Sequence, residues 1–72
     1  MYYIKDKKII KDVIKEFGYK GLPDYSRDKN TVVQLILYKN NTWELILTNK
    51  NTIESYLFDK NIWTMIKSIP AF

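Results

Sequence analysis

A repeated turn signal limits the fold of this chain more than any other feature. Asn-Thr steps at residues 30–31, 41–42 and 51–52 each stand directly before an apolar run. Asn tolerates the left-handed backbone conformation of tight turns, and Thr is a good residue for the start of a strand. Such regular spacing predicts a meander of short antiparallel strands at residues 31–38, 42–48 and 52–58.

The length of the loops between these strands decides which side chains share a face. A three-residue loop at 39–41 pairs Tyr38 with Thr42 and puts Asn41 where a positive φ is needed. This loop pairs Leu47 with Val33, Leu45 with Leu35 and Trp43 with Leu37. The same loop geometry at 49–51 would pair Leu47, Leu45 and Trp43, on their other side, with Ile53, Ser55 and Leu57. One sheet face is then almost wholly apolar, which favours this register.

Amphipathic segments flank the predicted strands on both sides. Residues 6–18 carry one apolar stripe, with Asp6 placed to cap the start of a helix and Gly18 to end it. The stripe consists of Ile9, Ile10, Val13, Ile14 and Phe17. Its other face is rich in lysine, and we interpret it as a solvated surface. Residues 62–69 have a broad apolar face and stop before Pro70, so they predict a second helix.

A competing interpretation starts a helix at Asn51, where Asn51 and Glu54 have the spacing of a capping box. Residues 52–69 would then be helical. The β-branched and aromatic side chains of residues 52–58 favour the strand instead. The expected fold is therefore α+β, a three-stranded antiparallel meander packed on one face by an N-terminal and a C-terminal helix (αβββα). A chain of 72 residues is expected to form one domain over residues 1–72.

The composition excludes several function classes. The sequence contains neither Cys nor His, which removes the usual nucleophilic thiol, the commonest zinc ligand and the usual general base near neutral pH. We therefore expect no enzyme activity, no cofactor and no metal. The net charge of +4 comes from 11 Lys and one Arg, and Lys is the less suited of the two to bidentate recognition of bases and phosphates.

The apolar runs are all shorter than the roughly 20 residues that cross a bilayer. The start of the chain also lacks the basic-then-apolar order of a signal peptide. We expect a cytoplasmic protein, in the host cell cytoplasm if it is viral, with no membrane partner.

The second face of the predicted sheet is the candidate partner-binding surface, since it is too apolar for an ordinary solvated face. Its candidate binding residues are Ile36, Tyr38, Glu44, Ile46, Glu54 and Tyr56. The long connection at 18–30 adds Tyr25 and Arg27, because loops of that length are often functional. The alternative is that the segment at 2–4 covers this face.

The run Asn30-Thr31-Val32-Val33-Gln34-Leu35-Ile36-Leu37, followed by Asn40-Asn41, resembles the central hairpin of a small phage anti-CRISPR protein of the type II-A inhibitor group. The resemblance covers about residues 30–48. It implies a mobile-element protein that occludes a larger protein, such as a host defence complex. That family member is strongly acidic whereas this chain is basic, so no functional residue is carried over.

We expect a small non-catalytic protein-binding inhibitor or accessory factor of a phage or mobile element, acting by occlusion. The alternative is a small nucleic-acid-binding αβββα module. It would use the lysines of residues 6–18 and the 18–30 connection.

Overall fold

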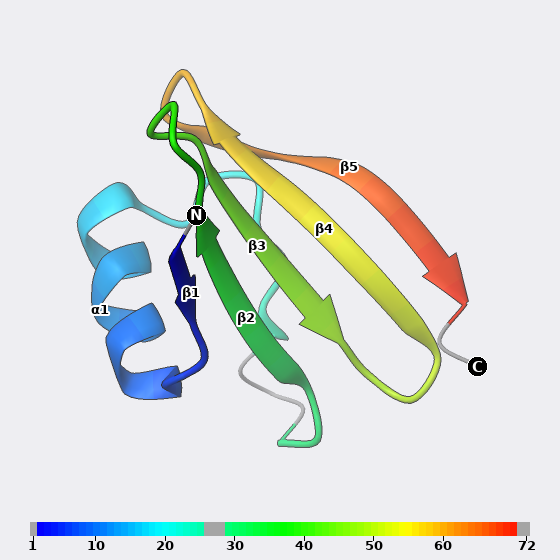
Figure 1. Ribbon diagram of the computed structural model, residues 1–72. Coiled ribbons are helices and arrows are strands. Elements are labelled where there is room, and N and C mark those ends of the chain that lie inside the picture. Colours follow the sequence, from blue (N-terminus) through cyan, green and yellow to red (C-terminus); the bar gives the residue numbers. More distant parts are fainter. Residues whose placement is uncertain (1, 26–28, 71–72) are drawn as a thin grey trace.

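The computed structural model describes residues 2–25 and 29–70, and this part of the chain contains one α-helix and five strands (Figure 1). The elements are β1 (Tyr2–Ile4), α1 (Lys7–Phe17), β2 (Val32–Leu37), β3 (Trp43–Thr48), β4 (Thr52–Asp59) and β5 (Ile62–Pro70). The strands form one antiparallel sheet in the order β1-β2-β3-β4-β5. The α+β class is thus confirmed, but the three-stranded meander with a C-terminal helix is wrong.

Helix α1 begins and ends where its local sequence predicts. The Asp6 carboxylate accepts hydrogen bonds from the backbone N–H groups of Lys8 and Ile9, at 2.9 and 3.4 Å. At the other end Gly18 has a φ of 93° and donates its N–H to the Ile14 carbonyl. The stripe is narrower than predicted, because Ile9 is 49% exposed. The helix therefore packs on the sheet chiefly through Ile10, Ile14 and the residues beside them.

The β2–β3 hairpin has the predicted register. Leu35 lies opposite Leu45, and the Tyr38 N–H bonds to the Thr42 carbonyl across the turn. Asn41 adopts a φ of 63°, the positive value that a three-residue loop requires. Leu35, Leu45 and Leu47 are almost completely buried, which confirms that they form the centre of the core.

Strand β4 is turned over relative to the prediction, because the β3–β4 hairpin has a shorter turn. Asn49 pairs with Thr52 across a two-residue turn, and the Asn49 side chain accepts hydrogen bonds from the N–H groups of Asn51 and Thr52, both at 2.8 Å. Leu45 consequently faces Tyr56 rather than Ser55. A one-residue shift of register moves every side chain to the other face of the sheet. Glu54, Tyr56 and Phe58 therefore point to the core side.

Residues 62–70 form strand β5 and not the predicted helix, and the competing helix from Asn51 is also absent from the described residues. The chain reverses at Lys60 and Asn61, whose φ values of 51° and 66° allow Asp59 to pair directly with Ile62. Two successive positive φ angles are typical of a two-residue type I′ hairpin turn. Pairing with β4 then satisfies backbone groups along β5, with one irregularity beside Tyr56.

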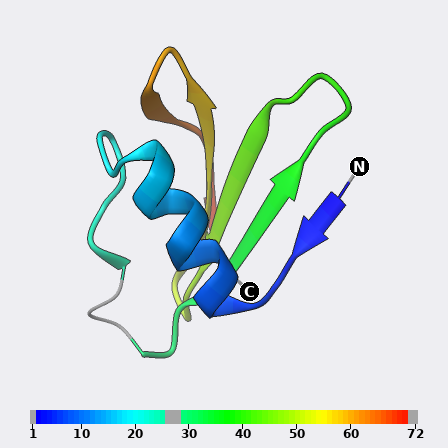
Figure 2. The same cartoon turned by 90° about the vertical axis from the view of Figure 1, so that its left-hand side faces the viewer.

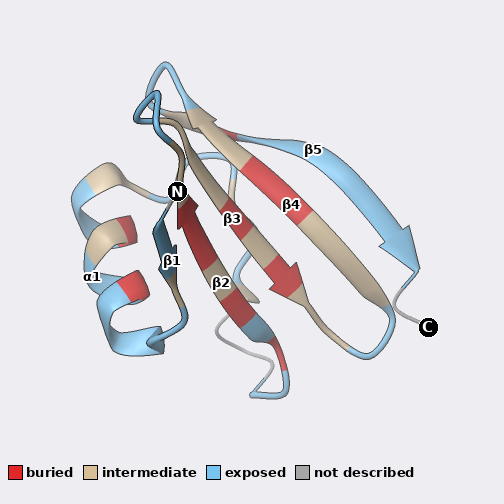
Figure 3. Cartoon of the chain, in the orientation of Figure 1, coloured by how far each residue is buried: buried red, intermediate tan, exposed pale blue. Residues whose placement is uncertain are grey.

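The core lies between α1 and one face of the sheet, as Figure 3 shows by its buried segments. Trp63 at the start of β5 supplies the apolar cover expected from a second helix: it is 2% exposed and its ring lies 5.0 Å from that of Phe58. Its indole N–H donates a hydrogen bond to the Gly18 carbonyl at 3.0 Å. Its backbone N–H donates to the Lys20 carbonyl at 2.8 Å. The segment after α1 is thereby tied to β5. A Cβ at Gly21 would lie only 2.0 Å from the Trp63 carbonyl oxygen, so this close approach requires glycine.

Candidate functional site

The sheet has one face turned toward α1 and one turned away from it, termed the open face. Figure 2 shows α1 and the segment after it on one side of the sheet, with no helix on the other. Strand β1 extends the sheet beside β2 and does not lie across the open face. The strand register and the groove described below assign to this face the apolar side chains of Tyr3, Val32, Ile36, Ile46, Ile53, Leu57, Ile66 and Ile69.

Several of these apolar side chains are exposed to an unusual degree. Val32 and Ile66 are 53% and 52% exposed, and Ile69 is 39% exposed. Ile36 is instead buried, between Tyr3 on β1 and Glu44 on β3 in the register. The open face therefore has a buried side chain at its centre and exposed apolar side chains on β1, β2 and β5.

A polar pair lies within this apolar surface. Tyr38, just after β2, donates its hydroxyl to the carboxylate of Glu44 on β3. This hydrogen bond is the largest cause that raises the pKa of Tyr38 to about 12, followed by desolvation and by the charges of Glu44 and Tyr3. The phenol therefore stays neutral at physiological pH and holds the carboxylate in a set orientation.

The pair borders a shallow groove of about 660 Å³ on the open face. Leu57 of β4 and Ile66 of β5 form its apolar side, and the β2–β3 turn forms the other. Ile66 reaches the groove from the irregular part of β5, where Tyr56 pairs with Met65 and Ser55 with Lys67. The groove combines apolar side chains with one oriented carboxylate and the ammonium group of Lys39, so it can accept an apolar side chain next to a polar group.

Half of the residues predicted to bind a partner lie together on the open face. The register places Ile36 opposite Glu44 and Gln34 opposite Ile46, and Tyr38 bonds to Glu44. The predicted partner-binding residues Ile36, Tyr38, Glu44 and Ile46 are thus neighbours. Whether they bind a partner stays a prediction.

The remaining predicted residues lie elsewhere. Tyr56 is 4% exposed in the core, where burial first and then Glu54 raise its pKa. Glu54 shares the core side with Tyr56, because β4 is turned over. Tyr25 packs against the core from the segment after α1, on the side away from the open face. Arg27 lies outside the described residues.

Sequence reasoning missed the contributions of β1, β4 and β5 to the open face. The three-residue turn predicted at 49–51 places Ile53, Ser55 and Leu57 on the core side, whereas the observed two-residue turn places them on the open face. Ile66 and Ile69 belong to the segment for which the sequence predicts a helix. The signal that could have found them is the Lys60-Asn61 step between two β-rich runs, since Asn readily takes a positive φ.

Within residues 2–25 and 29–70, no helix is both long and apolar enough to cross a membrane. The same residues contain no cluster of three or more carboxylate, imidazole or thiol side chains placed to hold a metal ion. No protein-family model, no curated protein and no solved structure matches this chain.

Proposed function

We propose that this chain is a small, non-catalytic protein-binding module that covers a surface of a larger protein with its open face. The observation that supports the proposal is the exposed apolar surface around Leu57, Ile66 and Ile69, over which no described element packs. Contiguous exposed apolar surface of this kind is typical of protein interaction sites.

The mixture of side chains also fits a protein partner. Protein interfaces combine aromatic and aliphatic anchors at the centre with a few polar groups that set the orientation. Tyr38 and Glu44 supply an oriented polar pair, and Leu57 and Ile66 supply apolar surface beside it. A matching partner would present an apolar side chain next to a polar group.

Strand β5 offers a second way to contact a partner, through the backbone groups at the edge of the sheet. It is one of the two edge strands of the sheet, and its residues 64–70 are exposed. An exposed sheet edge can accept a strand from another protein by backbone hydrogen bonding. The finer form of the proposal, an inhibitor or accessory factor that occludes a host defence protein, rests on the resemblance of residues 30–48.

The test compares two lysine substitutions at neighbouring positions of β5. Ile66→Lys places a charge on the open face, whereas Met65→Lys places the same charge at a similarly exposed position, paired with Tyr56 on the other face. The tagged chain is used to capture its partner from a lysate of the source cells, with and without nuclease. We expect Ile66→Lys to weaken capture by about tenfold or more, which corresponds to about 1.4 kcal/mol, and Met65→Lys to change it little.

Equal loss in both variants would instead indicate binding along the β5 edge alone. Capture that is unaffected by either variant would contradict the proposed use of the open face. Capture that disappears on nuclease treatment would favour the nucleic-acid-binding alternative.

A further inference from the structure

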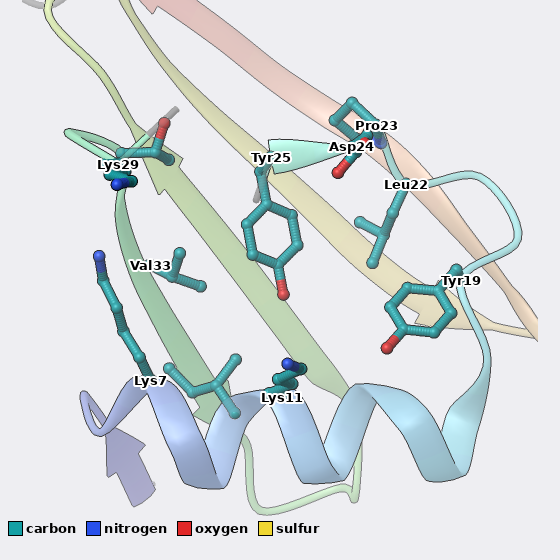
Figure 4. Close-up of a pocket in the computed structure, with 11 residues that line it drawn as sticks. Lys7, Lys11, Tyr19, Leu22, Pro23, Asp24, Tyr25, Lys29 and Val33 are labelled. Atoms are coloured by element: carbon teal, nitrogen blue, oxygen red, sulfur yellow. The ribbon is translucent and has the colours of Figure 1, made fainter. Parts of the chain in front are cut away.

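A pocket of about 570 Å³ lies on the helix side of the molecule, away from the open face. Figure 4 shows it between α1 and the segment that contains Tyr25. Its volume is within the range of roughly 300–1,000 Å³ that small-molecule sites occupy. The pocket shares neither residues nor surface with the groove proposed to bind protein.

The inner wall of the pocket is apolar. It includes Ile10 of α1 and Val33 of β2, which are 1% and 5% exposed and belong to the core. Leu22 packs against the same core from the segment after α1. Ile10 and Val33 are too deeply buried to touch a ligand, so the accessible apolar surface comes from the more exposed lining residues Tyr19, Leu22 and Pro23. A ligand with an aromatic or aliphatic body would lie against these side chains.

The mouth of the pocket is basic. Lys7 and Lys11 lie one turn apart on α1, and Lys29 comes from the chain just before β2 (Figure 4). Against these three ammonium groups, Asp24 is the carboxylate among the described lining residues. The excess of positive charge favours an anionic group at this mouth.

A neutral hydroxyl completes the site. The Tyr25 ring extends across the cavity toward α1 in Figure 4. Burial, and then the neighbouring Tyr19, raise the pKa of Tyr25, so its hydroxyl remains protonated and able to donate a hydrogen bond. An anion held by the lysines would thus meet a donor from the opposite wall.

We propose that this pocket binds a small organic anion, with a carboxylate or phosphate group held by Lys7, Lys11 and Lys29 and an aromatic or aliphatic body lying on Tyr19, Leu22 and Pro23. This site is separate from the proposed protein-binding face. Apolar burial and charge act on different parts of the ligand, so neither part alone should bind as well as the whole.

The experiment titrates the ¹⁵N-labelled chain with phenyl phosphate and follows the backbone amide signals of residues 22, 31 and 33 by NMR. Inorganic phosphate and phenol serve as the separate halves of the probe. The double variant Lys7→Gln/Lys11→Gln is compared with Lys8→Gln/Lys15→Gln, which removes the same charge from exposed positions of the same helix that do not line the pocket. All four lysines are exposed, so both variants should retain the fold, and their spectra check this.

We expect saturable shifts confined to the pocket and binding of phenyl phosphate at least about fivefold tighter than that of either half. Lys7→Gln/Lys11→Gln should weaken this binding about fivefold or more, and Lys8→Gln/Lys15→Gln less than about twofold. Equal weakening by both variants would indicate a general attraction to a basic helix and would overturn the proposal. Inorganic phosphate that binds as tightly as phenyl phosphate, or shifts that do not saturate, would also overturn it.

Discussion

Tyr56 lies on strand β4 and Tyr38 just after strand β2, and only Tyr56 belongs to the core. Tyr56 is 4% exposed and packs among Leu35 and Leu45, whereas Tyr38 lies at the margin of the open face. We expect Tyr56→Ala to lower the free energy of unfolding by about 3–5 kcal/mol, as for other large aromatic truncations in cores. Tyr38→Ala should lower it much less. Urea unfolding of both variants measures the difference.

A loss of that size approaches the whole stability of a small domain, so Tyr56→Leu is included as a milder core variant. It should still lower stability more than Tyr38→Leu. Equal effects at the two positions would contradict the register of β4.

The Tyr38–Glu44 hydrogen bond should be visible in the pH dependence of stability. Since the Glu44 carboxylate raises the pKa of Tyr38 from its ordinary value of 10.0 to about 12, the stability contributed by this pair is fully present below pH 10. It should be lost as pH rises from 10 to 12 and the phenol ionises. Glu44→Gln removes the carboxylate charge and should return the pKa of Tyr38 toward 10.0.

The titration is followed by NMR of tyrosine rings labelled at the ¹³Cζ position, with the Tyr38 signal assigned by Tyr38→Phe. An unchanged Tyr38 pKa in Glu44→Gln would show that the hydrogen bond is not formed in solution.

At the scale of elements, the two-residue turns at Lys50-Asn51 and Lys60-Asn61 have similar sequences and opposite backbone requirements. Only Lys60 and Asn61 have positive φ, which Asn and Gly adopt more readily than Lys. We expect Lys60→Asn/Asn61→Gly to raise the free energy of unfolding by about 1 kcal/mol. The same change at the other turn, Lys50→Asn/Asn51→Gly, should give no gain, because neither residue there needs a positive φ. Thermal or urea unfolding compares the two.

This pair of variants also tests whether β5 exists. If residues 62–69 were helical, a glycine just before them would relieve no strained turn, and Lys60→Asn/Asn61→Gly would give no increase in stability.

On the scale of the whole molecule, the order of the strands predicts a gradient of local stability. Strand β3 lies at the centre of the sheet and carries the buried Leu45 and Leu47, whereas β1 and β5 lie at its edges. Native-state amide hydrogen exchange should therefore be slowest in β3 and faster in residues 64–69. The Trp63 amide should be an exception within β5, because it donates to the Lys20 carbonyl.

Exchange protection at residues 64–69 equal to that of β3 would contradict an exposed edge at β5. It would instead indicate that another chain covers β5 in solution.

The helix, its ends and the first hairpin were predictable because each depends on contacts between residues close in sequence. Asp6 caps α1 with its own side chain, and Asn41 supplies the positive φ of a three-residue turn. The apolar alternation on both sides of that turn permits one register that buries Leu35 against Leu45. Four members of the candidate binding surface were predictable for the same reason.

The fourth strand was not decided by local sequence. Two-residue and three-residue turns both fit residues 49–52, and they turn opposite faces of β4 to the core. The structure has the register that buries Tyr56 opposite Leu45 and stacks Phe58 on Phe17 at 5.0 Å, whereas the predicted register would have placed Ser55 opposite Leu45. Large aromatic rings gain more from burial than Ser, so the core favours this choice.

Local sequence also left undecided whether residues 62–69 form a helix or a strand. Ile62, Ile66 and Ile69 have helical spacing, yet the β-branched and aromatic residues from 62 to 69 also suit a strand. By itself the sequence determined an α+β domain with an N-terminal helix and an antiparallel hairpin. Only the tertiary structure decided which face of the strand predicted at 52–58 meets the core, and that residues 62–70 form a further strand. Pairing β5 with β4 satisfies their backbone groups and places Trp63 in the core. That choice also put Leu57, Ile66 and Ile69 on the open face.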